Sequence, residues 1–321
     1  MQSLQKPMSP RARPGATRTP VQRATQASIG ERPSEQEIAA VKLLLEPWQW
    51  LTAPKFYGLE HIPTDRPFLL VGNHTLMGVL DVPLLILGLY ERRGVFVRSL
   101  GDHLHYRIPV WRDLLTRFGA VEGTRDNCRA LMRADEPILV FPGGGREVFK
   151  HKGERYRLIW KNRLGFVRLA IEQGYPIVPF AAVGAEECYD ILIDSDEIRA
   201  TPIGRVLERF VQRADEIPPL VRGLGPLPKP QRFYFKFSRL IATKPLAGRQ
   251  DDEAVCLELR TRVQRAIESG IRFLLRKRAA DPHRELPARL LARLGRVVSS
   301  RPAVPAGSAS APGVRRRGRN R

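Results

Sequence analysis

A histidine and an aspartate follow a short apolar segment, and together they have the residue types of a general base. His74 comes two residues after the apolar run 68–72, and Asp81 is the nearest acid to it in the sequence. A histidine can take a hydroxyl proton near neutral pH, while a carboxylate fixes its tautomer and stabilises the imidazolium. The alternative is a structural histidine beside an aspartate that caps the next helix. The residue types alone leave both readings open.

A glycine-rich turn with two charges follows a second apolar segment. The run 137–141 reads as a buried strand, and after Pro142 come Gly143, Gly144, Gly145, Arg146 and Glu147. Three glycines let the backbone bend sharply and turn its amides toward an anion or an oxyanion. Arg146 adds a forked donor that Glu147 is placed to orient. No GK[ST] follows, so this is not a Walker motif, and a tight turn with an exposed charge pair is the alternative.

Arg125 is a third candidate, because it follows a brief extended segment at 120–122. There it could clamp a phosphate or a carboxylate, although a solvated surface arginine fits the spacing equally well. No serine stands in a G-x-S-x-G elbow, and Cys128 lies inside an expected helix, where packing is its expected role. With no nucleophile for a covalent mechanism, the residues favour direct attack by a substrate hydroxyl on an activated acyl group.

Alternating strands and helices must position these residues. Apolar runs predict strands at 68–72, 94–98, 120–122, 137–141, 177–183 and 232–237, and periodicity and caps predict helices at 34–51, 82–90, 109–118, 124–132, 157–173, 203–213 and 252–278. Ser34 and Glu37 form the pattern of a capping box at the first helix. The layout predicts a single α/β domain with a mostly buried mixed sheet flanked by helices.

The charge is concentrated at the two ends of the chain. Of a formal net charge of +21, residues 1–33 hold +5 and residues 276–321 hold +11, which leaves +5 for the long middle. We therefore expect a disordered basic tail at 1–33, a catalytic domain at 34–280, a basic amphipathic helix at 281–300 and a second basic tail at 301–321. A nearly balanced middle argues against a nucleic-acid-binding core, so no nucleic-acid partner is expected.

The segment after Asp281 is typical of a helix that lies on an anionic membrane surface. One helical face carries Leu286, Leu290, Leu291, Leu294, Val297 and Val298, and the other side carries Arg289, Arg293 and Arg296. Docking on the domain is the alternative for this helix. Trp48 and Trp50 give the helix at 34–51 a surface that suits either lipid or ordinary core packing.

The features that the sequence lacks indicate where the protein is located and whether it needs a cofactor. No apolar run reaches the ~18 residues of a membrane-spanning helix, and the N-terminal segment has no apolar signal region. Three widely spaced cysteines without a CxxC pair favour neither disulfides nor zinc. We expect a cytoplasmic protein, peripheral on the inner face of a membrane, with no metal and no cofactor.

Taken together, the motifs resemble the phospholipid/glycerol acyltransferase superfamily, over about residues 55–244. The resemblance rests on 58–63, on Asn73-His74 with Asp81, on 119–125, on 141–147 and on 177–179. It implies that His74 is the catalytic base and Asp81 its partner. It further implies that Asn73 supports the turn or polarises the acyl carbonyl, and that Arg125, Gly143–Gly145, Arg146, Glu147 and Pro179 bind substrate.

Two departures from the family pattern bear on the substrate. The family usually places four residues between His and Asp, whereas six stand here, so Gly78 must break the segment if Asp81 is to reach His74. The glycine-rich block and residues 160–166 look more like diacylglycerol acyltransferases and phytyl ester synthases. A neutral acceptor is then as plausible as a lysophospholipid.

The resemblance implies an O-acyltransferase that moves a fatty acyl group from acyl-CoA or acyl carrier protein to a glycerolipid hydroxyl. Its expected partners are the co-substrate, a lipid acceptor and an anionic membrane surface. An esterase or thioesterase on the same scaffold is the near alternative, and a non-catalytic membrane-binding protein is the alternative of another class.

Overall fold

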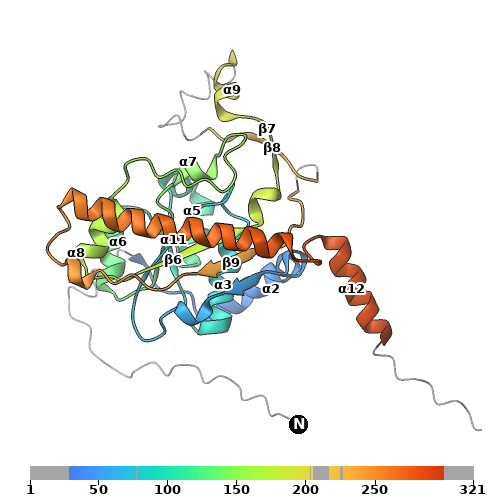
Figure 1. Cartoon of the computed structure of the whole chain (residues 1–321), viewed down its shortest axis with the longest axis horizontal. Helices are drawn as coiled ribbons and strands as arrows, with labels where there is room; N and C mark the ends of the chain where they lie inside the picture. Colours follow the sequence, from blue (N-terminus) through green and yellow to red (C-terminus); the bar gives the residue numbers. More distant parts are fainter. Residues whose placement is uncertain (1–28, 77, 203, 205–216, 225–226, 300–321) are drawn as a thin grey trace, which may run out of the picture.

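Seven strands form one mixed sheet in the computed structural model of the protein (Figure 1), which describes residues 29–299 except 77, 203, 205–216 and 225–226. In spatial order they are β1 (Lys55–Tyr57), β9 (Tyr234–Phe237), β6 (Ile177–Val183), β2 (Leu69–Gly72), β5 (Ile138–Val140), β3 (Arg98–Gly101) and β4 (Val121–Glu122). The strands from β6 to β4 are parallel, and β9 is antiparallel to β6. The predicted single α/β domain with a mostly buried mixed sheet is confirmed.

Strand β2 occupies the centre of the sheet and pairs in parallel with two neighbours. Leu69 lies opposite Ile138 of β5 and opposite Ile177 of β6. The carboxyl ends of three adjacent parallel strands therefore meet at the same edge. This is where the loops of an open α/β sheet usually form a binding site.

Helices cover both faces of the sheet. They are α2 (Glu35–Thr52), α3 (Val82–Arg93), α4 (His103–Tyr106), α5 (Pro109–Arg117), α6 (Arg125–Arg133), α7 (Gly145–Val148), α8 (Gly165–Glu172), α9 (Ser195–Arg199), α11 (Glu253–Ala279) and α12 (Leu286–Ser299), with 3₁₀ turns η1 (Leu59–His61), η2 (Ala185–Glu187) and η4 (Lys244–Leu246). Helix α11 runs across one face, and α12 points away from the body (Figure 1). A two-stranded antiparallel sheet of β7 (Asp190–Ile193) and β8 (Leu220–Arg222) lies beside α9 at the periphery. Within the described residues, no helix is both long and apolar enough to cross a bilayer.

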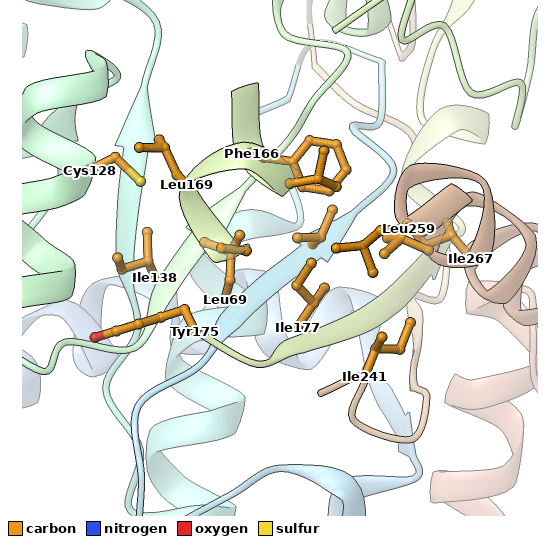
Figure 2. Packing of buried hydrophobic residues seen from close by; sticks show 14 of the residues in the cluster. Leu69, Cys128, Ile138, Phe166, Leu169, Tyr175, Ile177, Ile241, Leu259 and Ile267 are labelled. Atoms are coloured by element: carbon orange, nitrogen blue, oxygen red, sulfur yellow. The ribbon is translucent and has the colours of Figure 1, made fainter. Parts of the chain in front are cut away.

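The strands divide their side chains between two cores, as the period of two in a strand requires. Leu69 and Val71 of β2 belong to the cluster under α6, α8 and α11, where Leu69, Ile138 and Ile177 face Leu259 and Ile267 (Figure 2). Leu70 and Phe68 belong to the opposite cluster, against α3. Burial on both faces makes β2 a rigid base for the residues that follow it.

Several predicted helices form as expected. Helix α2 begins at the predicted capping box, in which the Ser34 side chain accepts from the Glu37 amide and the Glu37 carboxylate accepts from the Ser34 amide. Helix α11 begins at Asp252, whose side chain accepts from the Val255 amide. In both cases a local signal and an apolar face agree.

Other sequence predictions are wrong or fall on undescribed residues. The helix expected at 157–173 begins only at Gly165, because Tyr156 and Lys161 adopt left-handed backbone conformations and the Ile159 amide donates to Glu147. The strand expected at 94–98 begins at Arg98, whose amide donates to the Pro137 carbonyl. Except for Gly204, the helix expected at 203–213 lies outside the described residues, as do the tail at 301–321 and residues 1–28 of the tail expected at 1–33.

The packing of α11 gives a matched pair of substitutions. Leu259 is 3% exposed and Leu257 is 40% exposed on the same helix. Leu259→Ala should lower the free energy of unfolding by about 2–5 kcal/mol, because it leaves a cavity under β6. Leu257→Ala should change it by less than about 1 kcal/mol. Chemical denaturation measures both, and equal losses would contradict this packing.

Candidate functional site

Three segments converge at the carboxyl edge of the sheet. Asn73 and His74 follow β2, the glycine-rich turn and Glu147 follow β5, and Glu186 follows β6. Since β2 lies between β5 and β6, residues from both neighbours contact the segment after β2. The parallel topology thus places two of the predicted motifs together.

Asn73 fixes the end of β2 to β6. Its Nδ2 donates to the Ala182 carbonyl oxygen at 3.0 Å, and its Oδ1 accepts from the Ala182 amide at 2.8 Å. The side chain is fully buried. Asn73 was expected either to support the turn or to polarise the acyl carbonyl. This geometry favours support of the turn, because both polar atoms of the side chain already bond to the backbone.

The His74 imidazole is held between an aromatic ring and a glycine. It stacks on Phe141, with ring centroids 4.0 Å apart and an angle of 18° between the planes. Gly78 has a φ of +61°, and a Cβ there would lie 2.4 Å from His74 Cε1, so only glycine fits. The His74 Nδ1 is buried and has no hydrogen-bond partner among the described residues.

The environment of His74 keeps the imidazole neutral. Burial, helped by the positive charge of Lys150 and by His105, lowers the pKa of His74 to about 3. With its pKa that low, the imidazole is neutral throughout the ordinary pH range, and one ring nitrogen keeps a free lone pair. This is the protonation state that a general base requires before reaction.

Asp81 does not bond to His74 in this structure. Gly78 does break the segment, but the Asp81 carboxylate turns back to accept from Thr75 Oγ1 at 2.8 Å. Nor does the Asp81 side chain cap α3, as the sequence suggested. Burial raises the pKa of Asp81 to about 6, and the Thr75 hydrogen bond partly opposes this rise. The Thr75–Asp81 contact fixes the loop that carries Gly78 beneath the imidazole.

Glu147 contacts backbone amides and not the arginine beside it. Its Oε2 accepts from the His74 amide at 3.0 Å and its Oε1 from the Ile159 amide at 2.7 Å. Burial raises the pKa of this fully enclosed carboxyl, while Lys150 and the two amides lower it. A Cβ at Gly143 would lie 2.1 Å from the Glu147 Cδ, so the glycine makes room for this carboxylate.

The remaining glycines and Arg146 have their own contacts. Gly144, with a φ of +51°, donates its amide to the Phe141 carbonyl, and Gly145 begins α7. Arg146 pairs with Glu154 at 2.6 Å, so the expected pairing with Glu147 is wrong. The reason is that Glu147 is turned inward to the amides of His74 and Ile159.

Two other predicted residues lie elsewhere. Arg125 is exposed at the start of α6, after β4, and β4 is three strands from β2, or about 14 Å across the sheet. Pro179 is buried inside β6, opposite Val71. Neither is brought to His74 by the topology.

Sequence reasoning missed Lys150 and Glu186, which form a buried ion pair. Lys150 stands in a stretch rich in basic residues, so its sequence gives no sign of burial. Glu186 did carry a signal, because it comes shortly after the buried strand expected at 177–183. An acid at the carboxyl end of such a strand is a site candidate.

The site lies within a segment that matches a known protein family. Residues 53–183 match the family model described as Acyltransferase. This segment holds β2, β5, β6 and the residues around His74, so the match covers the centre of the sheet and the candidate site.

Curated relatives extend the likeness beyond this segment. The chain is 31% identical over 254 residues to phytyl ester synthase 1, chloroplastic, of Arabidopsis thaliana, covering 73% of this chain and 36% of the relative. It is 32% identical over 123 residues to the human "DGAT1/2-independent enzyme synthesizing storage lipids", covering 38% of this chain and 37% of the relative. The chain spans about a third of the length of these relatives.

A solved structure is also similar. The 1-acyl-sn-glycerophosphate acyltransferase of Thermotoga maritima aligns with a TM-score of 0.42 at 16% identity, over 74% of this chain and 83% of that chain.

The buried Asp81 carboxyl predicts a pH-dependent gain in stability for Asp81→Asn. The folded pKa of about 6 exceeds the ordinary 3.8, so the folded chain holds this proton more tightly than the unfolded chain. Stability is therefore lost as the pH rises between these values, by up to about 3 kcal/mol. Asparagine keeps an acceptor for Thr75 and removes the buried charge.

Urea denaturation of both proteins across the pH range measures this effect. The gain in unfolding free energy should be near zero at about pH 4 and reach its plateau above about pH 6. His74 titrates in both proteins, so its contribution cancels in the difference. A gain that does not vary with pH would contradict the assignment.

Proposed function

We propose that the protein is an O-acyltransferase in which His74 is the general base. The observation that carries the proposal is a neutral imidazole fixed at the carboxyl end of the central strand, within a segment that matches the acyltransferase family model. The phytyl ester synthase and storage-lipid relatives support an ester as the product. The proposed co-substrate is acyl-CoA or acyl carrier protein.

The proposed reaction needs no covalent enzyme intermediate. His74 takes the proton of the acceptor hydroxyl as its oxygen attacks the carbonyl carbon of the thioester. The tetrahedral intermediate collapses, the carbon–sulfur bond breaks, and the imidazolium returns its proton to the thiolate. The amides of Gly143 and Gly145 are our candidates for holding the oxyanion, because the Gly144 amide already bonds to Phe141.

The charges around His74 favour an acceptor without a phosphate. The Arg146 guanidinium pairs with Glu154, and the Lys150 ammonium pairs with Glu186. Arg125, our other candidate for a phosphate, follows β4 at the far edge of the sheet. Diacylglycerol or a fatty alcohol would bring no unpaired negative charge beside the buried carboxylates.

Product analysis tests both the reaction and the acceptor. Purified protein is given labelled oleoyl-CoA with an equimolar pool of lysophosphatidate, diacylglycerol and a long-chain alcohol, and products are identified by mass spectrometry. We expect label in the neutral esters. His74→Ala should fold normally and lose about 10²- to 10⁴-fold in rate.

Other results would contradict parts of the proposal. Free fatty acid as the sole product would show an esterase or thioesterase. Equal rates for His74→Ala and the wild type would leave only a non-catalytic or differently placed function. Phosphatidate as the main product would overturn the neutral acceptor while keeping the reaction.

We also propose that the protein acts at an anionic membrane surface, on the cytoplasmic side. Helix α2 packs one face on the domain and leaves an exposed apolar stripe, with Leu43 at 72%, Leu44 at 74% and Trp50 at 44% exposure. Ala40 and Pro47 lie exposed on the same stripe, at spacings of three and four residues. An unpartnered apolar stripe of this kind suits the interfacial layer of a bilayer.

Helix α12 is held against the end of α2. Arg289 was expected on the side of this helix opposite its apolar face. In the structure it is buried and donates to the Leu51 carbonyl at 2.5 Å and to the Pro230 carbonyl at 3.1 Å. It anchors the start of α12 to the domain, while Leu290 and Leu291 remain exposed. The basic residues beyond this anchor would add attraction to anionic lipid.

Sedimentation with vesicles tests the membrane proposal. The full chain, a chain lacking residues 282–321 and the variant Leu43→Gln/Leu44→Gln are mixed with vesicles with and without about a third anionic lipid. The truncation should weaken binding mainly to anionic vesicles, and it should do so less at high salt. The double variant should weaken binding to both kinds. Unchanged binding in all three would overturn the proposal.

A further inference from the structure

A buried lysine and a buried glutamate meet beneath His74. Lys150 follows α7 and Glu186 lies in η2, and both side chains are almost completely enclosed. The Lys150 ammonium forms an ion pair with Glu186 and also donates from Nζ to the His74 carbonyl oxygen at 3.0 Å. One side chain therefore joins the residues that follow β5, β2 and β6.

This contact completes the support of the His74 backbone. The His74 amide donates to Glu147, and the His74 carbonyl accepts from Lys150. Strand β2 ends at Gly72, so these two groups lie beyond the pairing that fixes the strand. Beyond the strand, two buried charged side chains fix the backbone of His74 instead.

Stability alone does not account for the ion pair. Desolvation of two buried charges nearly offsets their attraction, and an apolar pair of similar volume is often as stable. An apolar side chain, however, cannot donate a hydrogen bond to the His74 carbonyl. The feature that only the lysine supplies is a directional contact with the backbone of His74.

Glu186 in turn holds the lysine. Its Oε1 pairs with Lys150, and its Oε2 accepts from the Tyr156 amide at 2.6 Å. With both oxygens engaged, the carboxylate has one orientation, and the ammonium that it binds is aimed at His74. The position of the imidazole is thus tied to the turn after β6 as well as to the turn after β5.

We propose that Lys150, held by Glu186, is a positioning residue that sets the place of the His74 imidazole relative to the acceptor hydroxyl. The inference rests on the proposed function, because it requires His74 to be the base. A displacement of about 1 Å at such a group costs on the order of 10²-fold in rate. Substrate binding should not depend on this contact.

The test separates positioning from folding with a compensated pair of substitutions. Lys150→Met leaves Glu186 buried without its partner and should lower both the melting temperature and kcat. Adding Glu186→Gln removes the stranded charge, keeps an acceptor for the Tyr156 amide, and should recover most of the melting temperature. It cannot restore the donor to His74, so kcat should stay about 10- to 100-fold low with KM within about threefold of the wild type.

Three outcomes decide the inference. Recovery of kcat together with the melting temperature in the double variant would overturn it, because the pair would then only stabilise the fold. A rise in KM at constant kcat would also overturn it. If the double variant does not fold, Glu186→Gln alone decides: a lower kcat at constant KM supports the inference, and an unchanged kcat contradicts it.

Two further variants complete the experiment. Lys55→Met removes a partner of the buried Asp281 carboxylate, on β1 and outside the site, and should lower stability with no change in kcat. His74→Ala separates this inference from the proposed function. An active His74→Ala would overturn the function itself, whereas an inactive His74→Ala beside a fully active double variant would overturn only the role of Lys150.

Discussion

The parallel pairing of β2 with β5 and β6 is the constraint on which the site depends. Because both neighbours run in the same direction as β2, their following turns emerge at the edge where His74 stands. An antiparallel neighbour would place its following turn at the opposite edge. The glycine-rich turn and the turn with Glu186 can then contact His74 from either side, although more than thirty residues separate them along the chain.

The same arrangement explains why the site carries so much buried charge. The backbone of Asn73 and His74 leaves the sheet while still enclosed, so its polar groups need partners other than a neighbouring strand. Asn73 pairs with Ala182, and Glu147 and Lys150 pair with His74. Each partner must itself be satisfied, which brings in Glu186 and the Ile159 amide. The charges form a connected set whose members support one backbone segment.

Sequence reasoning recovered the elements with strong local signals and the motifs at strand ends. The capping box at Ser34, the apolar runs of β2 and β6 and the long α11 were predictable because each signal lies within a few neighbouring residues. The helix expected at 157–173 failed because a distant carboxylate, Glu147, takes the Ile159 amide. Likewise, Arg146 and Glu147 are adjacent in sequence but do not pair. Glu147 is buried and accepts from two backbone amides, while Arg146 pairs with Glu154. Contacts between distant segments decide such cases, and no local pattern encodes them.

The formal net charge of +21 hides a difference between the surroundings of His74 and the two ends of the chain. Around His74, three buried carboxyl groups, Asp81, Glu147 and Glu186, stand against one buried ammonium, Lys150. Burial raises the pKa values of all three carboxyls, because the enclosed site stabilises negative charge poorly, and an added anion there would meet the same loss of solvation. Positive charge instead gathers toward the ends of the chain, which can attract an anionic surface without altering the site. Under the function proposed above, this separation keeps the charges that would attract a bilayer away from a site that takes an acceptor without a phosphate.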